Sequence, residues 1–244
     1  EEARYANARG YSKHKPALPL YTAGDAVRAL ELLESFGYGR TKEILPGISL
    51  TFQRSGHILG SAICAFDLKS SSRRIVFTGD LGRYDVPIIQ DPERVERADA
   101  LISESTYGDR THDHVSPVDA LVKVIVETFE RGGVVVIPAF AIGRTQDLLF
   151  HLRALEEDKR IPVADVFVDS PMACDATPIY LAHPVEHDLF MRMFVERGGS
   201  PLRTLRTRFV TSVKESKQIN EVKGPAIIIS ASGMATGGRI LHHL

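Results

Sequence analysis

Short apolar runs alternate with helix-like segments throughout the second half of the chain. Residues 134–137 read Val-Val-Val-Ile, and a continuous β-branched run of this kind is typical of a strand buried on both faces of a parallel sheet. Similar short runs occupy residues 166–168 and 226–229, and helical periodicity marks residues 118–129 and 145–155. Strands and helices that alternate in this way predict an α/β domain built on a parallel sheet.

The first half of the chain has a different pattern. Residues 48–53 alternate apolar and polar side chains, and further strands are expected at 61–68, 73–77 and 100–103. An amphipathic helix is predicted over residues 23–36. Successive antiparallel strands with a helix on one face indicate half of an αββα sandwich.

The composition changes near residues 108–118, so two domains are expected, 1–110 and 111–244. Thr22 and Gly37 are the expected caps of the first long helix. A short helix or turn is expected at 91–98, and further helices at 173–180, 184–196 and 238–244.

Bulk properties narrow the class of protein. The contents of hydrophobic residues, 43%, and charged residues, 25%, are ordinary for a soluble globular protein, and no apolar run approaches a membrane span. The net charge of −1 shows no basic excess, so any nucleic-acid-binding surface must be a local basic patch. Cys64 and Cys174 are expected to be free thiols, which favours a cytoplasmic location. Because the chain starts without Met and stops inside an apolar periodic segment, both ends are expected to be cuts through a longer protein.

Three chemistry-bearing side chains each follow a predicted strand. His57 lies in a loop after the strand at 48–53, Asp80 follows the strand at 73–77, and Glu104 follows the last strand of the first half. Any one of them alone would more often cap a turn or form a surface hydrogen bond. Together they supply nitrogen and oxygen ligands for a hard or borderline metal ion.

The residues around these positions carry a family resemblance. The segments SGHILGSA, FTGDLGR, SESTYGDR, PAFAIGRTQ and SASGMATGGR occur in this order along nearly the whole chain. In that order they resemble the β-CASP branch of the metallo-β-lactamase superfamily, whose members are zinc-dependent nucleases of RNA processing. The implied fold is a partial metallo-β-lactamase sandwich over 1–110 followed by a β-CASP domain over 111–244.

The resemblance implies a chemistry for the site. His57 and Asp80 correspond to metal ligands, and Asp80 would bridge two zinc ions about 3.5–4 Å apart that activate the attacking water. Glu104 corresponds to an acidic residue that orients a downstream His near the scissile phosphate; the alternative is an ion pair with Arg110. The upstream His-x-His-x-Asp-His motif and the later His motifs of the family do not occur in these 244 residues, which are therefore expected to hold zinc poorly and to be inactive alone.

Other histidines invite a metal interpretation. His112-Asp113-His114 has suitable spacing, but it follows the Glu104 motif, whereas the family's His cluster precedes the His57 motif; we interpret it as a solvated loop. His242 and His243 are interpreted as surface residues.

Two loops that follow parallel strands suit phosphate. Arg144 and Thr145 begin a helix, where backbone N–H groups, the helix dipole and a guanidinium would all attract an anion. Ser230, Ser232 and Gly233 repeat this arrangement after the last strand. The alternative is a pair of ordinary βα loops.

The function implied by this resemblance is zinc-dependent cleavage of RNA phosphodiester bonds, by an endonuclease or a 5′-exonuclease mode. Expected partners are single-stranded RNA and no membrane, with a homodimer as a candidate assembly. Two alternatives remain open: a non-catalytic scaffold in RNA processing, and a metallo-hydrolase of small esters. The retained His57, Asp80 and Glu104 argue against the scaffold, and the phosphate-ready loops argue against the esterase.

Overall fold

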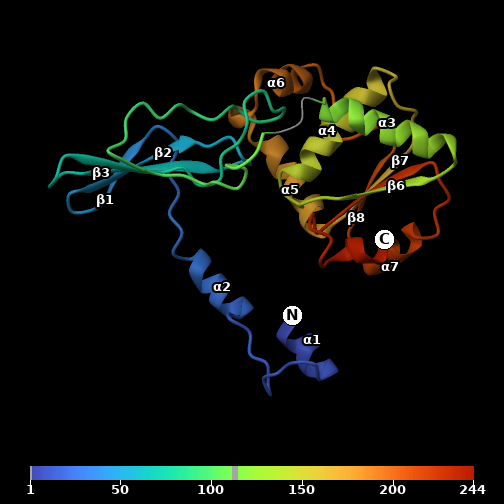
Figure 1. Cartoon of the computed structure of the whole chain (residues 1–244), viewed down its shortest axis with the longest axis horizontal. Coiled ribbons are helices and arrows are strands. Elements are labelled where there is room, and N and C mark those ends of the chain that lie inside the picture. The colour runs from blue at the N-terminus through green and yellow to red at the C-terminus, as the bar shows by residue number, and fades with distance from the viewer. Residues whose placement is uncertain (1, 112–114) are drawn as a thin grey trace. The chain divides into compact units, whose positions relative to one another are not determined.

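The computed structural model describes residues 2–111 and 115–244 and divides into two compact units, Glu1–Arg40 and Thr41–Leu244 (Figure 1). The domain boundary at 110/111 stays a prediction. Within the described residues, no helix combines the length and the apolar character that a membrane span requires.

The first unit contains helices α1 (Glu2–Arg9) and α2 (Ala23–Leu30). Thr22 caps α2 as predicted, because its hydroxyl accepts a hydrogen bond from the Asp25 N–H while the Asp25 carboxylate accepts the Thr22 N–H.

The predicted end of this helix is wrong. α2 is capped by Glu31 and does not reach Phe36 or Gly37. The apolar stripe that favoured a longer helix is exposed, with Leu33 at 74%. Since tertiary packing supplies most of the stability of a short helix, an unburied stripe does not extend it.

The second unit begins with a five-stranded sheet of order β1-β2-β3-β4-β5. The strands are β1 (Thr41–Leu45), β2 (Ile48–Arg54), β3 (Ala62–Leu68), β4 (Arg73–Phe77) and β5 (Ala100–Ile102). β1 lies outside every strand predicted from the sequence, since its residues are all exposed and polar side chains dominate its start.

The last pairing in this sheet differs from the prediction. β1 to β4 pair antiparallel, but β5 pairs parallel with β4. The long connection over residues 78–99 permits this crossover. Residues 91–98 form neither a helix nor a turn. Instead, the Glu93 N–H donates to the Arg54 carbonyl, and the Glu93 carboxylate pairs with the Arg54 guanidinium at 2.7 Å.

The second sheet has four strands, all parallel, in the order β6-β9-β7-β8. They are β6 (Val134–Pro138), β7 (Asp165–Asp169), β8 (Thr207–Val210) and β9 (Ala226–Ser230). The predicted parallel α/β architecture is therefore confirmed. β8 was not predicted, because its Thr-Arg-Phe-Val sequence lacks a continuous apolar run.

Helices cover both faces of this sheet. They are α3 (Pro117–Glu130), α4 (Arg144–Glu157), α5 (Pro171–Ala182), η1 (Pro184–Glu186), α6 (Leu189–Glu196), α7 (Val213–Ile219) and η2 (Arg239–His242). Alternate residues of β9 enter two different cores: Ile227 and Ile229 pack in one core together with Leu149 of α4, and Ile228 packs in the other together with Ile219 of α7. Figure 1 shows α3 and α4 on the opposite side of the sheet from α7.

Two predicted helices are corrected. The segment 184–196 breaks between η1 and α6, because the Asp188 carboxylate caps α6 by accepting the Met191 N–H at 2.6 Å. The segment 238–244 forms only the short 3₁₀ helix η2.

Loops that leave the first sheet pack on the second. Ile88 is 1% exposed and belongs to the core beneath α4, and Leu59 packs against the same core. The Arg54 guanidinium binds the Glu186 carboxylate at 2.6 Å. These contacts bring the β2–β3 loop and the β4–β5 connection next to α4 and α5.

Candidate functional site

His57 lies in the tight loop between β2 and β3. The Ser61 hydroxyl accepts hydrogen bonds from the His57 and Ile58 backbone N–H groups, at 3.1 and 3.2 Å. Gly56 adopts a positive φ of 66°, which favours glycine at the turn. The loop conformation therefore follows from the Ser-Gly-His-Ile-Leu-Gly-Ser sequence, and it holds the imidazole at the end of the sheet.

Asp80 lies at the end of β4, in the neighbouring loop. Gly79 has a φ of 58°, and the Thr78 N–H donates to the Ile102 carbonyl, so the chain turns sharply where β4 ends. The Asp80 Oδ2 atom is 3.8 Å from the His57 Nε2 atom, and the two side chains are 75% and 45% exposed. The imidazole and the carboxylate therefore converge on one solvent-accessible point.

Gly82 explains how the two loops can lie this close. Its N–H donates to the Ser55 carbonyl at 2.8 Å. A Cβ atom at position 82 would be 1.9 Å from the Gly56 carbonyl oxygen, a backbone atom that cannot move aside. The second glycine of Thr-Gly-Asp-Leu-Gly is thus required for the loops that carry His57 and Asp80 to meet.

Glu104 lies beside this pair. Its carboxylate accepts the Leu81 N–H at 2.6 Å. This bond, together with hydrogen bonds from Thr106 and the nearby charge of His57, lowers the pKa of the Glu104 carboxyl. Arg110 binds Asp109 at 2.9 Å, so the alternative ion pair between Glu104 and Arg110 is not what forms.

The donor atoms can be compared with what a metal ion needs. Zinc prefers imidazole nitrogen and carboxylate oxygen, and its protein sites normally use three or four such ligands. Across residues 2–111 and 115–244, no group of three or more His, Cys, Asp or Glu side chains could hold a metal ion. His57 and Asp80 therefore fit part of a zinc site, and a complete site needs donors from outside the described residues. His112-Asp113-His114 lies outside them.

The loop before α4 satisfies its own backbone groups. The Gly143 N–H donates to the Gln146 side chain at 2.8 Å, and the Thr145 N–H and hydroxyl both donate to the Phe140 carbonyl. The helix start is therefore capped internally. Arg144 is the group that this loop can offer an anion, since its side chain is 57% exposed and pairs with Asp147 at 3.7 Å.

The loop after β9 lies against the loop after β6. β6 and β9 are neighbours, and the Ala139 N–H donates to the Ser230 carbonyl at 3.0 Å. A Cβ atom at Gly233 would be 2.9 Å from the Phe140 backbone nitrogen. The Ser230 hydroxyl is buried and donates to the Asp169 carbonyl, whereas Ser232 is half-buried. The two predicted phosphate loops are therefore adjacent. The Thr145 and Ser230 hydroxyls, however, donate hydrogen bonds to backbone carbonyls of the protein.

Asp147 is a titratable group that the sequence did not reveal. Burial raises the pKa of its carboxyl to about 6, against the opposing charges of Arg144, Arg83 and His57. Tyr180 of α5 also faces it, and burial raises the pKa of that phenol. The start of α4 lies against the loop that carries His57, because a Cβ atom at Gly143 would be 2.7 Å from the Ile58 side chain.

We expect Asp147→Asn to stabilise the protein at pH 7 and to leave its stability unchanged near pH 4. The folded carboxyl binds its proton more tightly than the unfolded one, so stability falls as the pH rises from about 4 to about 6. The gain at pH 7 should be about 1–3 kcal/mol. Urea unfolding at both pH values measures it. Asp119→Asn is the control, because Arg160 lowers the pKa of Asp119 and the change should bring no gain.

A buried polar network at the carboxyl end of β7 was also missed. The Asp169 carboxylate is fully buried and accepts hydrogen bonds from Arg239 at 2.6 Å, from His243 at 2.8 Å and from the Ser216 hydroxyl. The His243 imidazole is 0% exposed, and its Nδ1 lies 2.6 Å from the Asn220 Oδ1 atom. The expectation of a surface residue is wrong for His243. The sequence shows only that Asp169 ends an apolar strand, which does not indicate its partners.

Comparisons with known proteins agree with this arrangement. Residues 145–244 match the family model described as the Beta-Casp domain. The chain is 33% identical over 234 residues to "Ribonuclease TTHA0252" of Thermus thermophilus, a match that covers 93% of this chain and 52% of that protein. It is 34% identical over 230 residues to "Transcription termination factor FttA" of Methanosarcina mazei, covering 91% of this chain and 36% of that protein.

A further relative, the protein of the same name from Methanothermobacter thermautotrophicus, is 36% identical over 214 residues and covers 84% of this chain. The chain spans about half or less of the length of these relatives. The domain match begins at Thr145, in the helix whose start lies against the loop that carries His57. Residues 145–244 thus match the Beta-Casp domain, and the chain as a whole is similar to proteins of the β-CASP branch of the metallo-β-lactamase superfamily.

Proposed function

We propose that this chain is part of a metal-dependent ribonuclease that hydrolyses RNA phosphodiester bonds. The observation that carries the proposal is the convergence of the His57 and Asp80 side chains, 3.8 Å apart on two loops that Gly82 allows to meet. Nitrogen and carboxylate donors at this separation suit a shared metal ion, and the relatives named ribonuclease and termination factor support RNA as the substrate.

The proposed metal is zinc, two ions in a complete site. When bound, the ions would activate a water molecule and neutralise charge on the phosphate. The residues of this chain would hold the metal: His57 and Asp80 contribute donor atoms. The Glu104 carboxylate is held next to Asp80 by the Leu81 N–H. Glu104 is proposed to orient a His that is not among these 244 residues and that protonates the leaving oxygen.

The proposed RNA track runs over the two loops at the carboxyl edge of the second sheet. Arg144 supplies an exposed guanidinium, which also pairs with Asp147, and Ser232 and Gly233 lie in the adjoining loop. The Thr145 and Ser230 hydroxyls already have hydrogen-bond partners within the protein. We therefore propose that they shape the two loops and do not bind phosphate themselves. Single-stranded RNA fits a track that contacts phosphates without reading a duplex groove.

Three finer assignments stay with this proposal. The five-stranded sheet would be one layer of an αββα sandwich, with 1–110 and 111–244 as the two domains. The two free thiols, Cys64 and Cys174, support a cytoplasmic location. The homodimer and the choice between endo- and exonuclease modes stay predictions.

Metal removal tests the proposal. The full-length protein is expected to cleave a single-stranded RNA oligonucleotide, to lose this activity after chelation and to regain it with zinc. Single-stranded DNA and a small ester run in parallel. RNA cleavage that survives complete chelation would contradict the metal, and hydrolysis of the ester without cleavage of RNA would favour the esterase alternative. Absence of both would favour the scaffold.

A further inference from the structure

The loop after β9, residues 231–238, is closed by hydrogen bonds between its own ends. The Ser232 N–H donates to the Gly237 carbonyl at 3.2 Å. Just outside them, the Ile240 N–H donates to the Ala231 carbonyl at 3.0 Å. The loop therefore has a defined shape, and that shape depends on how the two ends are held.

Asp169, at the end of β7, binds the residues on both sides of this loop. The Ser230 hydroxyl, before the loop, donates to the Asp169 carbonyl at 3.0 Å. The Arg239 guanidinium, after the loop, donates to the Asp169 carboxylate at 2.6 Å and to the Thr211 carbonyl at 2.6 Å. The Asp169 side chain is 0% exposed and that of Arg239 is 22% exposed, so the ion pair is shielded from water. Because breaking such a pair leaves a charge buried, the two ends of the loop are held together firmly.

The loop offers backbone N–H groups to an anion. Among the described residues, five of its N–H groups have no hydrogen-bond acceptor, those of Gly233, Met234, Thr236, Gly237 and Gly238. Successive N–H groups of a turn can converge on the oxygens of a phosphate. Because such binding depends on the direction of each N–H bond, it is sensitive to the shape of the loop.

We propose that Arg239 is a positioning residue for RNA: its ion pair with Asp169 keeps the loop after β9 in the shape whose backbone N–H groups bind an RNA phosphate. This inference rests on the proposed function, which supplies RNA as the ligand. Arg239 does not contact the phosphate itself, because its guanidinium is directed to Asp169 and to the Thr211 carbonyl. The exposed cation beside the loop is Arg144.

Arg239→Met in the full-length protein tests this role. The variant keeps most of the side-chain volume but loses both hydrogen bonds, so the loop should lose its shape. The KM for a single-stranded RNA oligonucleotide should rise about tenfold, the factor that one hydrogen bond to a charged group contributes. The kcat should stay the same, since a raised KM at constant kcat marks lost binding away from the reacting atoms. Arg239→Lys keeps a cation beside Asp169, and its KM should be intermediate.

Hydrogen exchange followed by mass spectrometry measures the shape of the loop without RNA. The peptide that contains residues 231–240 should exchange faster in Arg239→Met than in the wild type, because the hydrogen bonds between the loop ends open more often. This measurement separates the two proposals. Absence of RNA cleavage by the wild type contradicts the proposed function, whereas exchange that Arg239→Met does not accelerate contradicts the positioning role.

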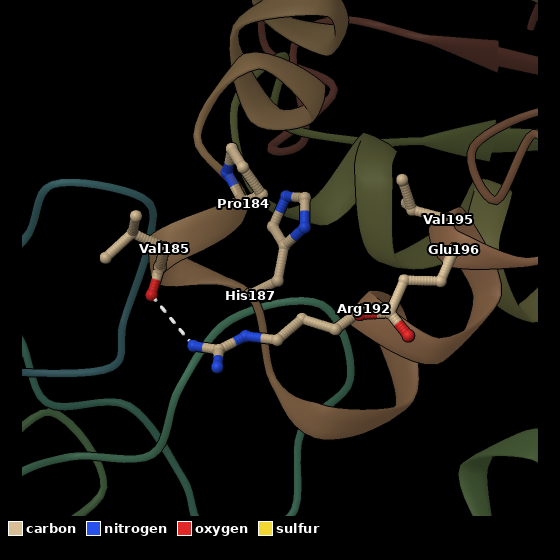
Figure 2. Close-up of a pocket in the computed structure, with 6 residues that line it drawn as sticks. All are labelled: Pro184, Val185, His187, Arg192, Val195 and Glu196. Atoms are coloured by element: carbon tan, nitrogen blue, oxygen red, sulfur yellow. Dashed lines mark hydrogen bonds between the residues drawn. The ribbon is translucent and has the colours of Figure 1, made fainter.

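Ser216→Ala is the matched control. The Ser216 hydroxyl also donates to the buried Asp169 carboxylate, but it lies in α7, outside the loop. This variant should lose stability, as Arg239→Met does, and yet keep the KM and the exchange of the loop. Arg192→Met is the second control. The Arg192 guanidinium donates to the Val185 carbonyl at 2.9 Å beside the pocket between η1 and α6 (Figure 2), and its loss should change neither quantity.

Three outcomes overturn the proposal. An equal rise of KM in Ser216→Ala would show that the effect follows stability alone. A raised KM in Arg239→Met without faster exchange would mean that Arg239 contacts RNA directly. A lower kcat at constant KM would assign the loop to the chemical step. If Arg239→Met does not fold, Arg239→Lys decides, because lysine lacks the planar fork that binds Asp169 and Thr211 together; wild-type KM and exchange in that variant would then contradict the role.

Discussion

Asp80→Ala in the intact protein is expected to lower kcat/KM for RNA cleavage by about a thousandfold. A metal ion supplies several kcal/mol of transition-state stabilisation, and each factor of ten in rate corresponds to about 1.4 kcal/mol. Removal of a carboxylate that holds the metal loses this contribution. Initial rates on a single-stranded RNA oligonucleotide measure the effect, and metal content measured on the same samples should fall in parallel.

The fold should not change in this variant. The Asp80 side chain is 75% exposed, and its Oδ2 atom lies 3.8 Å from the His57 Nε2 atom. Asp109→Ala is the control, since that carboxylate is 71% exposed and pairs with its neighbour Arg110. It should keep full activity. A loss in Asp80→Ala of less than tenfold, with metal content unchanged, would remove Asp80 from the proposed metal centre.

Asp169→Ala is expected to lower the free energy of unfolding by about 3–5 kcal/mol, the cost of removing one partner from a buried ion pair. The carboxylate is 0% exposed and holds Arg239 and His243. Without it, the His243 Nε2–H has no acceptor and the Ser216 hydroxyl loses its own. The free energies of unfolding come from urea denaturation followed by circular dichroism.

Asp165→Ala provides the comparison within the same strand. Its side chain is 31% exposed and lies 3.7 Å from Arg208, a pair whose contribution should be below about 1 kcal/mol. Equal losses in the two variants would show that the Asp169 network contributes no more than a surface pair.

Three strands of the second sheet, β6, β7 and β9, could be predicted because each contains a continuous apolar run. Val134–Pro138 and Ala226–Ser230 can be recognised as strands from their own sequences, because successive apolar side chains indicate burial on both faces of a sheet. β8 and β1 carry charged or polar residues and depend on their neighbours in the sheet. Local sequence patterns identify strands whose side chains are apolar throughout. They miss strands that form only because a neighbouring strand pairs with them.

Some residues of the candidate site could also be predicted from local sequence, and others could not. His57 and Asp80 could be predicted as a pair because each follows a strand within a glycine-rich motif, and the structure places them together. The link between Asp169 and His243 joins residues 74 positions apart. Nothing in either local sequence indicates it, because it depends on where η2 packs after the sheet has formed. The raised pKa of Asp147 likewise depends on burial by loops from other parts of the chain.

The order β6-β9-β7-β8 also has a consequence for synthesis on the ribosome. β9 follows β7 and β8 along the chain, yet it lies between β6 and β7 and all five of its residues are buried. A nascent chain that has emerged only as far as β8 therefore contains β6 without its neighbour, and the backbone edges of β6 and β7 that pair with β9 are open. Unpaired backbone N–H and C=O groups along these edges can bind foreign strands, so this half of the molecule should need chaperone protection until residues 226–230 leave the exit tunnel.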